Sequence, residues 1–509
     1  MKDISKILRK RYLKSTFLGL STSILISFPV YSETFSEAFS KARSNGLTEF
    51  MYNGSMYSTQ TKEEQESTNY GPFPVTLKNY SGTKTNSVSY TGQIARHVLH
   101  DSLKKISAKG NGNSNPLLYL DMSSYFYGSD DNLKIIAPAS KDGFPVKQTM
   151  LNEISKGKNL SGKIYKGVVT GWPNQMTGAE VVDFWMKKAS ESNGGFDASV
   201  GYNYTQLISK FIMGAVFYHQ AVDNYLDEKL SAEKKPNNKP YKDGAHYTGK
   251  EHSWDEAFGY WGVAAHGLNH SAKDNYNISK MKDLSVADYN KDGVVDLRSE
   301  MTFAHAYYAS SFDKSGKTDY LSIVTKSFID GRNIITSAKG EALSDSQRNK
   351  LYALAKVIHE NWQAVIAESV FKYAGSVYKD ISKMEELIAS GGDTSKAFKT
   401  YAKHWGELKG FSLALQTGKN NLGETAAYLN REVGFGPVLL NSSQVTGIDS
   451  KGNYLKDEAI TWGQYKLNMI KIQKLMIEKF NVKARGNDQT DKMAALAEKL
   501  GDLTSAEND

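Results

Sequence analysis

The oxygen-bearing side chains with the most specific spacing lie in the segment DYNKDGVVDLRSE, residues 288–300. Counted from the first aspartate, positions 1, 3, 5 and 9 carry carboxylate or amide oxygens, from Asp288, Asn290, Asp292 and Asp296. Gly293 at position 6 fits the sharp turn of an EF-hand, and the backbone carbonyl at position 7 belongs to Val294. Calcium prefers hard oxygen donors at this spacing. The sequence therefore predicts an EF-hand-like calcium loop.

This loop departs from the EF-hand pattern at its last ligand. The bidentate glutamate belongs at position 12, where this sequence has Ser299, and Glu300 follows one place later. We take Glu300 as the sixth ligand and expect a weaker or less selective site. The alternative is an Asx-rich turn in which Asp296 or Ser299 caps a helix that begins near Glu300. Since no nucleophile or general base accompanies the ligands, calcium is expected to be structural here.

A second set of candidate ligands comes from the ten histidines. Several form pairs at helical spacing, which can direct two ligands at one transition metal: His97 and Asp101, His219 and Asp223, His252 and Glu256, His266 and His270, and His404 and Glu407. From these pairs we predict a second metal site, for iron or zinc, at His219, His252 and Glu256. The alternative is structural, because Ser253 and Glu256 fit a capping box at a helix start.

Catalytic motifs are missing from the sequence. It has no HExxH zinc motif, no GxSxG nucleophile elbow, no P-loop and no GxGxxG fingerprint, and it has no cysteine. We therefore predict no catalytic and no cofactor-binding residue, and favour a protein that is not an enzyme. A pair of carboxylates for glycoside cleavage is brought together by the fold rather than by spacing, so a hydrolase stays open as an alternative.

The first 32 residues predict export. Six basic side chains precede the apolar run STFLGLSTSILISFPV, Pro29 ends it, and Ser32 is a small residue suited to a cleavage site. Residues 1–32 are therefore predicted to be a signal peptide, with an uncleaved signal anchor as the alternative. The mature chain is expected to be periplasmic or secreted, without a transmembrane span. Without residues 1–32 the net charge of the chain falls from +8 to about +3. The remaining sequence has no basic patch of the kind that binds nucleic acid.

Two kinds of composition divide the remaining chain. Residues 33–86 are rich in Ser, Thr, Asn and Gly and predict a polar N-terminal arm. From residue 87 to 505, apolar side chains recur at the three- and four-residue intervals of buried helix faces, which predicts one helical domain. A segment rich in Pro, Gly and Lys at 231–252 predicts a surface loop within it.

Helical spacing is clearest in segments that we expect to form helices at 146–157, 178–191, 203–232, 301–312, 319–332, 345–376, 379–391, 394–416, 422–433, 460–480 and 490–503. No fixed-period repeat accompanies them, so a solenoid is not expected. The sequence therefore predicts an all-α fold: a large, helical, bundle-like domain with small β additions.

Five segments, taken together in this order, resemble the bacterial family described as domain of unknown function 4856 over about residues 70–500. They are SVSYTGQIARHVLHDSL (87–103), LISKFIMGAVFYHQAVDNYLDEK (207–229), KEHSWDEAFGYWG (250–262), ADYNKDGVVDLRSE (287–300) and GFGPVLLN (434–441). The resemblance implies an exported, largely helical protein, often lipid-anchored in relatives. Because this chain has no cysteine to acylate, it departs from that habit.

The resemblance also implies a setting, since members of that family are often encoded near imelysin-like proteins and outer-membrane receptors linked to iron uptake. Such proteins are therefore the expected partners. The GxHxxE motif of imelysins fails here, because Gly249 replaces the glutamate after Gly244 and His246. We expect an exported accessory or binding protein in iron or metal acquisition, with structural calcium. The alternative is a hydrolase or glycan-binding protein with an aromatic-lined cleft.

Overall fold

The computed structural model describes residues 35–44, 49–52, 55–58, 67–128, 130 and 132–506. The predicted signal peptide, residues 1–32, lies outside this part of the chain. The chain divides into two units, residues 1–67 and 68–509. Residues 68–86, which we assigned to the arm from their composition, belong to the second unit, where Tyr70 and Phe73 are buried in its core.

The first unit contains a short helix and a hairpin. Helix α2 (Phe35–Ser44) buries Ala38 and Ala42, and strands β1 (Glu49–Tyr52) and β2 (Ser55–Ser58) pair antiparallel. The ring of Tyr52 packs edge-on against that of Phe35, with centroids 5.3 Å apart. Aromatic contacts of this kind hold the hairpin on the helix.

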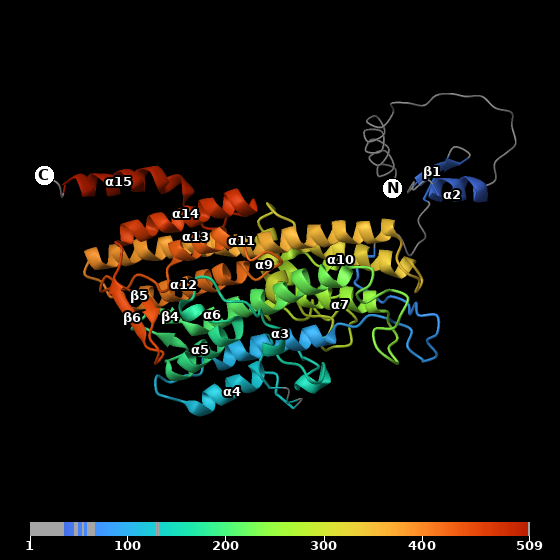
Figure 1. Cartoon of the computed structure of the whole chain (residues 1–509), viewed down its shortest axis with the longest axis horizontal. Helices are drawn as coiled ribbons and strands as arrows, with labels where there is room; N and C mark the ends of the chain where they lie inside the picture. The colour runs from blue at the N-terminus through green and yellow to red at the C-terminus, as the bar shows by residue number, and fades with distance from the viewer. Residues whose placement is uncertain are drawn as a thin grey trace, which may run out of the picture. The chain divides into compact units, whose positions relative to one another are not determined.

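The second unit consists mostly of helices, as predicted (Figure 1). Its longer helices are α3 (Thr91–Ile106), α4 (Pro116–Phe126), α5 (Gly178–Glu191), α6 (Tyr204–Ile212), α7 (Gly249–Trp261), α8 (Ala272–Ser279), α9 (Ala304–Asp313), α10 (Tyr320–Ser337), α11 (Asp345–Ala389), α12 (Ser395–Leu415), α13 (Gly423–Val433), α14 (Trp462–Phe480) and α15 (Met493–Ala506). The small β additions are the antiparallel pairs β3 (Phe196–Asp197) with β4 (Tyr202–Asn203), and β5 (Ser443–Ile448) with β6 (Tyr454–Glu458).

Helix α11 is the centre of the packing in this unit. It contacts α12, α14 and α10, while α12 contacts α6, and α6 contacts α3 and α5 (Figure 1). One continuous core therefore runs through the layers, with fully buried Trp185, Trp254, Trp362 and Trp405 among its largest side chains. Burial of this much apolar surface stabilises the unit without disulfides.

Helix α11 also corrects one prediction. We expected two helices, at 345–376 and 379–391, but the helix continues from 345 to 389. No proline lies near residue 377, Gly375 stays within the helix, where it packs closely on the backbone of Asn487, and Val377 and Tyr378 are both buried. The buried face therefore passes through the predicted break.

Two further expectations about local structure were wrong. Residues 146–157 contain only the short 3-10 turn η1 (Leu151–Glu153), because the Glu153 carboxylate accepts hydrogen bonds from the backbone N–H groups of Thr149 and Met150 and closes a turn. Helix α7 begins at Gly249, and its capping box is formed by Thr248 and Glu251 rather than by Ser253 and Glu256. The surface loop that precedes it consequently ends at residue 248.

Helix α6 continues without a break into π-helical turns, η4 (Met213–Tyr218) and η5 (Gln220–Tyr225). The cause is close packing on α12: a Cβ atom built on Gly214 would lie 2.4 Å from the Cβ atom of Ala414. Such π-turns recur at functional sites. Here the widened turns follow directly on the part of α6 that lines a polar cavity among the helices.

Candidate functional site

A cavity of about 460 Å³ lies among α3, α6, α8, α9, α11 and α12. Its lining is unusual for a helical bundle because it gathers amines, phenols and carboxylates rather than apolar side chains. The ionisable members are Asp101, Lys104, Lys210, Lys280, Tyr307, Tyr308, Lys372, Tyr373, Lys403, His404 and Glu407. A volume of this order matches the pockets that bind small molecules.

Lys210 is the most buried of these amines, with 3% of its surface exposed. It lies on α6, where the backbone of α12 comes very close: a Cβ atom on Gly410 would be 2.6 Å from the Cβ atom of Lys210. Only glycine therefore leaves room for the lysine at this crossing. The Lys210 amine forms a long ion pair with Glu407, 3.8 Å away.

Three lysines of the cavity lie over tyrosine rings. The amine of Lys280 is 4.4 Å from the ring centre of Tyr307, and that of Lys210 is 5.4 Å from the ring centre of Tyr308. Lys372 lies 5.5 Å from the ring centre of Tyr373 in the same way. Since the ring faces attract cations, these contacts hold the amines in place without neutralising their charge.

The cavity carries an excess of positive charge. Five lysines line it against the two carboxylates of Asp101 and Glu407, which leaves an excess of three charges when all are ionised. Burial, together with Lys104 and Lys280, lowers the pKa of Lys210 well below its usual range. Burial and the neighbouring Lys104 lower the pKa of Lys280 to about 8. Since the neighbouring lysines disfavour one another's charge, a bound anion would reduce this repulsion.

Two of the predicted histidine–carboxylate pairs fall at this cavity, but with other partners. His404 forms its ion pair with Asp380, with His404 Nδ1 2.6 Å from the carboxylate, while Glu407 pairs with Lys210. Asp101 approaches His100 at 3.0 Å rather than His97. The helical spacing therefore identified residues that lie at the cavity, but it predicted the wrong partners for them.

The predicted calcium ligands Asp288, Asn290 and Asp292 gather in one tight turn. The backbone N–H of Asp292 donates to Oδ1 of Asp288 at 3.1 Å and to Oδ1 of Asn290 at 2.9 Å, which places these two oxygens side by side. Glu300 faces the same loop, and its Oε1 accepts from the N–H of Tyr289 at 3.2 Å. Burial raises the pKa of the Glu300 carboxyl, although these backbone hydrogen bonds oppose the shift. Although Glu300 stands one place later than the last ligand of an EF-hand, its side chain still contacts the loop.

Asp296 also has partners outside this group of oxygens, and the Lys147 amine is near both, 3.8 Å from Oδ2 of Asp296 and 4.0 Å from Oδ2 of Asp292. The Asp296 carboxylate accepts from Nε of Arg298 at 2.9 Å and from Nε2 of Gln148 at 2.8 Å. Burial alone would raise its pKa, but these hydrogen bonds outweigh it and the pKa of Asp296 is lowered. The chain donates the N–H of Val294 to Asp292, and Val295 bridges to Val146 on a neighbouring segment. Asp288, Asn290, Asp292 and Glu300 thus lie around one loop, whereas Asp296 has other partners. Among the described residues no group of three or more Asp, Glu or His side chains is arranged for a metal ion, so calcium at residues 288–300 stays a prediction.

The helix expected near Glu300 begins later, at Ala304. Neither Asp296 nor Ser299 caps it, because residues 297–303 intervene and the residue before the helix is Phe303. The capping part of this alternative is therefore wrong, whereas the Asx-rich turn itself is present, since backbone N–H groups of residues 292–294 donate to the side chains of Asp288, Asn290 and Asp292.

The second predicted metal site is only partly assembled. His252 Nε2 lies 3.8 Å from Oε1 of Glu256, which also accepts from Gln93 at 2.9 Å. His219 has a different set of partners: its Nδ1 donates to the carbonyl of Thr417 at 3.0 Å and lies 3.6 Å from Oδ2 of Asp223, the pair that the spacing predicts. Across the residues that the structure describes, no cluster of three or more His, Cys, Asp or Glu side chains is arranged to hold a metal ion. A metal at His219, His252 and Glu256 stays a prediction.

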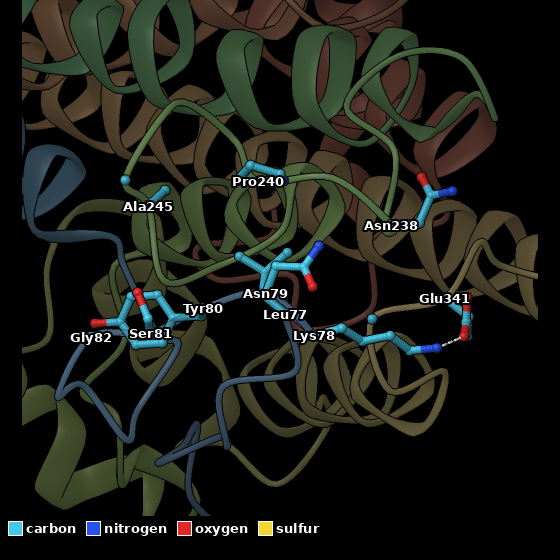
Figure 2. A pocket seen from close by; sticks show the side chains of 12 residues that line it. Leu77, Lys78, Asn79, Tyr80, Ser81, Gly82, Asn238, Pro240, Ala245 and Glu341 are labelled. Carbon is cyan, nitrogen blue, oxygen red and sulfur yellow. Dashed lines mark hydrogen bonds and ion pairs between the residues drawn. The ribbon is translucent and has the colours of Figure 1, made fainter.

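A second, larger hollow of about 640 Å³ lies between residues 77–82, the 238–245 loop and residues 340–341 (Figure 2). Figure 2 shows the Lys78 amine and the Glu341 carboxylate facing one another across its edge, where they form an ion pair. Tyr80 supplies the aromatic ring of its lining. Because Lys78 and Glu341 neutralise each other, this hollow presents less unpaired charge to a ligand than the lysine-rich cavity does.

Together these observations define a helical protein with a positively charged interior cavity and an acidic loop beside it. The chain belongs to the family described as domain of unknown function 4856, whose model matches residues 79–427, more than half of its length. The match is shorter than the 70–500 expected, and GFGPVLLN lies beyond it. No curated protein and no solved structure matches the chain. Within the described residues, none of the helices is both long and apolar enough to cross a membrane.

Proposed function

We propose that this protein is a binding protein whose lysine-rich cavity takes a small, multiply charged anion. The observation that carries the proposal is the gathering of Lys104, Lys210, Lys280, Lys372 and Lys403 around a space that holds two carboxylates. Amines in a partly desolvated cavity attract carboxylate and phosphate groups more strongly than amines in water do. The cation–π contacts fix them in position before the ligand arrives.

The class of ligand follows from the size and the chemistry of this cavity. About 460 Å³ accommodates a compact organic polyanion or an anionic metal chelate, such as a ferric polycarboxylate complex. We propose the chelate, since a role in iron or metal acquisition is what the family resemblance implies. In this proposal the protein works outside the cytoplasm, hands its cargo to an outer-membrane receptor or an imelysin-like partner, and uses calcium at residues 288–300 as a structural clip.

A hydrolase or glycan-binding protein remains the second candidate, and one observation favours it. The same cavity contains the rings of Tyr307, Tyr308 and Tyr373 beside the carboxylates of Asp101 and Glu407. Aromatic rings stack on sugars, and paired carboxylates cleave glycosidic bonds. Its excess of lysines, however, matches an acidic ligand better than a neutral glycan.

Isothermal titration of the protein with citrate, ferric citrate and inorganic phosphate tests the proposal. We expect the Lys210→Met variant to bind the preferred anion at least about 30-fold more weakly, because about 2 kcal/mol of charge interaction is lost. Methionine keeps the length and the apolar stem of the lysine but leaves the buried Glu407 without its amine partner, so near-ultraviolet circular dichroism and a melting curve of the variant accompany the titration. Lys356→Met is the matched control, since the Lys356 side chain is 74% exposed on α11.

Three results would decide between the candidates. Binding that weakens with salt and is lost in Lys210→Met supports the anion-binding protein. Equal affinities in Lys210→Met and Lys356→Met, or no binding of any of the three anions, would contradict it. Release of sugars from an oligosaccharide by the wild type and not by Glu407→Gln would establish the hydrolase instead.

A further inference from the structure

Several histidines outside the cavity have a buried ring nitrogen without a hydrogen-bond partner, and two of them, His266 and His270, have their rings in contact. His266 and His270 flank the 3-10 turn η7 (Gly267–Asn269), and their rings lie 4.8 Å apart in an edge-to-face arrangement. The Nε2 atoms of both rings are buried and unpartnered. His266 is 3% exposed. A buried imidazole nitrogen normally has a partner, so unpartnered Nε2 atoms on two rings in contact make these rings candidates for a shared ligand.

The turn that carries the two rings is rigid. Nδ2 of the fully buried Asn275 donates to the carbonyl of Gly267 at 2.9 Å and also lies 3.4 Å from that of His270. The backbone N–H of Asn269 donates to the carbonyl of His266 at 2.9 Å, which closes the turn. The positions of both rings are thus set by the fold before any ligand binds.

The ring of His266 is also fixed in orientation. Tyr289 stacks on it, with centroids 4.2 Å apart and planes 13° from parallel. The Tyr289 hydroxyl in turn accepts from Nδ2 of Asn269 at 3.3 Å. Side chains that orient a ligating histidine in this way are a regular part of metal sites.

We propose that Nε2 of His266 and Nε2 of His270 bind a borderline divalent transition metal, such as Cu²⁺ or Zn²⁺. Imidazole nitrogens suit these ions, whereas calcium takes oxygen ligands, so this site is chemically distinct from the 288–300 loop. Burial lowers the pKa of His266 to about 4 and lowers that of His270, which leaves both rings neutral and able to coordinate at neutral pH. His270 is only half-buried, so water or an external ligand can complete the coordination.

Electron paramagnetic resonance of tag-free protein with one equivalent of Cu²⁺, in saturating Ca²⁺, tests this site. We expect hyperfine coupling from two imidazole nitrogens in the wild type. His270→Ala should lose one of them and bind more than about 100-fold more weakly, while Tyr289→Leu should weaken binding about 10-fold because His266 is no longer held. His246→Ala is the control, because His246 is equally half-buried but lies in the 231–248 loop.

Further measurements separate this site from its neighbours. Asp292→Ala should leave the copper spectrum unchanged, since that carboxylate belongs to the calcium loop. Near-ultraviolet circular dichroism confirms that each variant is folded. A wild type without nitrogen coupling, or a His270→Ala variant with the wild-type spectrum and affinity, would overturn the proposal. So would an equal loss in His246→Ala. None of these results depends on whether the lysine-rich cavity binds an anion.

Discussion

Arg332 offers a quantitative test of what holds the helical unit together. Its side chain is 0% exposed on α10 and donates to four side chains: to Asp255 at 2.9 Å, Glu251 at 3.2 Å, Thr336 at 2.6 Å and Ser87 at 2.6 Å. One guanidinium therefore joins α7 and α10 to the segment before α3. The two carboxylates are buried completely and have no other cation as partner in this network.

The Arg332→Met substitution removes this charge and keeps most of the volume. It leaves two buried carboxylates without their cation, although Asp255 still accepts from Tyr70 and Ser89. Loss of one partner from a buried ion pair costs about 3–5 kcal/mol. The unfolding entropy scales with length to about 0.9 kcal/mol per degree for the 442 residues from 68 to 509. We therefore expect the melting temperature to fall by about 3–5 °C.

The pH dependence gives this prediction a second readout. Burial raises the pKa of Asp255, and the Arg332 guanidinium opposes that rise. Without Arg332 the folded-state pKa climbs further above the unfolded value, so the folded variant holds its proton more tightly. The stability of Arg332→Met therefore falls as the pH rises above the unfolded-state pKa of Asp255 towards its folded-state pKa, and it recovers as the pH falls. The deficit in Arg332→Met should be smaller at pH 5 than at pH 8.

Differential scanning calorimetry of wild type, Arg332→Met and Arg431→Met at both pH values provides the comparison. Arg431 is 71% exposed, so its replacement should change the melting temperature by less than about 1 °C. A melting temperature of Arg332→Met within 1 °C of the wild type at pH 8 would refute the reasoning. A deficit that grows on acidification would refute the electrostatic part alone.

Two other predictions concern single ionic sites. Calcium at 100 times its dissociation constant should stabilise the wild type by about 2.7 kcal/mol, and chelator or Asp292→Ala should abolish the corresponding rise in melting temperature; an unchanged melting curve in chelator would contradict the calcium clip. Burial lowers the pKa of Lys409 to about 7 in the folded protein. Between pH 7 and about pH 10 the unfolded chain therefore holds a proton that the folded chain has lost, so the wild type should gain stability as the pH rises through this range. Lys409→Met should remove that gain, so the variant should compare less favourably with the wild type at pH 9 than at pH 7, on top of the pH-independent loss of the hydrogen bonds to Asn430 and Gly434; parallel pH profiles of the two proteins would refute it.

The sequence predicted most helices because their buried faces are continuous. Residues 178–191 were expected to be helical, and α5 has those bounds because Thr177 and Glu180 form a capping box around its start. Helix α4 was missed because its apolar side chains do not form one stripe: Leu117 is 78% exposed and Leu120 is 60% exposed. The available signal was Asn115 followed by Pro116, an N-cap with proline at the first helical position.

The lysine-rich cavity was not predicted, and the reason is its topology. Each of its lysines lies on a different part of the chain, where a single lysine is typical of a solvated helix face. Only Lys210 carried a local signal, since it lies between apolar residues in the segment LISKFIMG, where a charge needs a partner. The acidic loop at 288–300 could be predicted because its oxygen-bearing residues are contiguous, but the contact of Asp296 with Gln148 depends on a segment far away in the chain.

The acidic loop and the cavity are close enough in the chain for calcium to influence anion binding. Residue 300 is followed after three residues by α9, whose Tyr307 and Tyr308 line the cavity beneath two of its lysines. Ala304, at the start of that helix, has a φ of 40°, a strained backbone for alanine that its surroundings must maintain. Loosening the loop should therefore misplace the tyrosines and weaken their contacts with the amines.

We accordingly expect chelation of calcium to weaken anion binding in the titration described above, by about 5-fold or more if the coupling is of the usual size of 1–3 kcal/mol. Linkage requires the reciprocal effect, so the anion must tighten calcium binding by the same factor. The Asp292→Ala variant should show the weaker anion affinity whether or not chelator is present, whereas Lys356→Met should respond to chelator as the wild type does. Equal anion affinities with and without chelator would mean that the loop stabilises the fold without acting on α9.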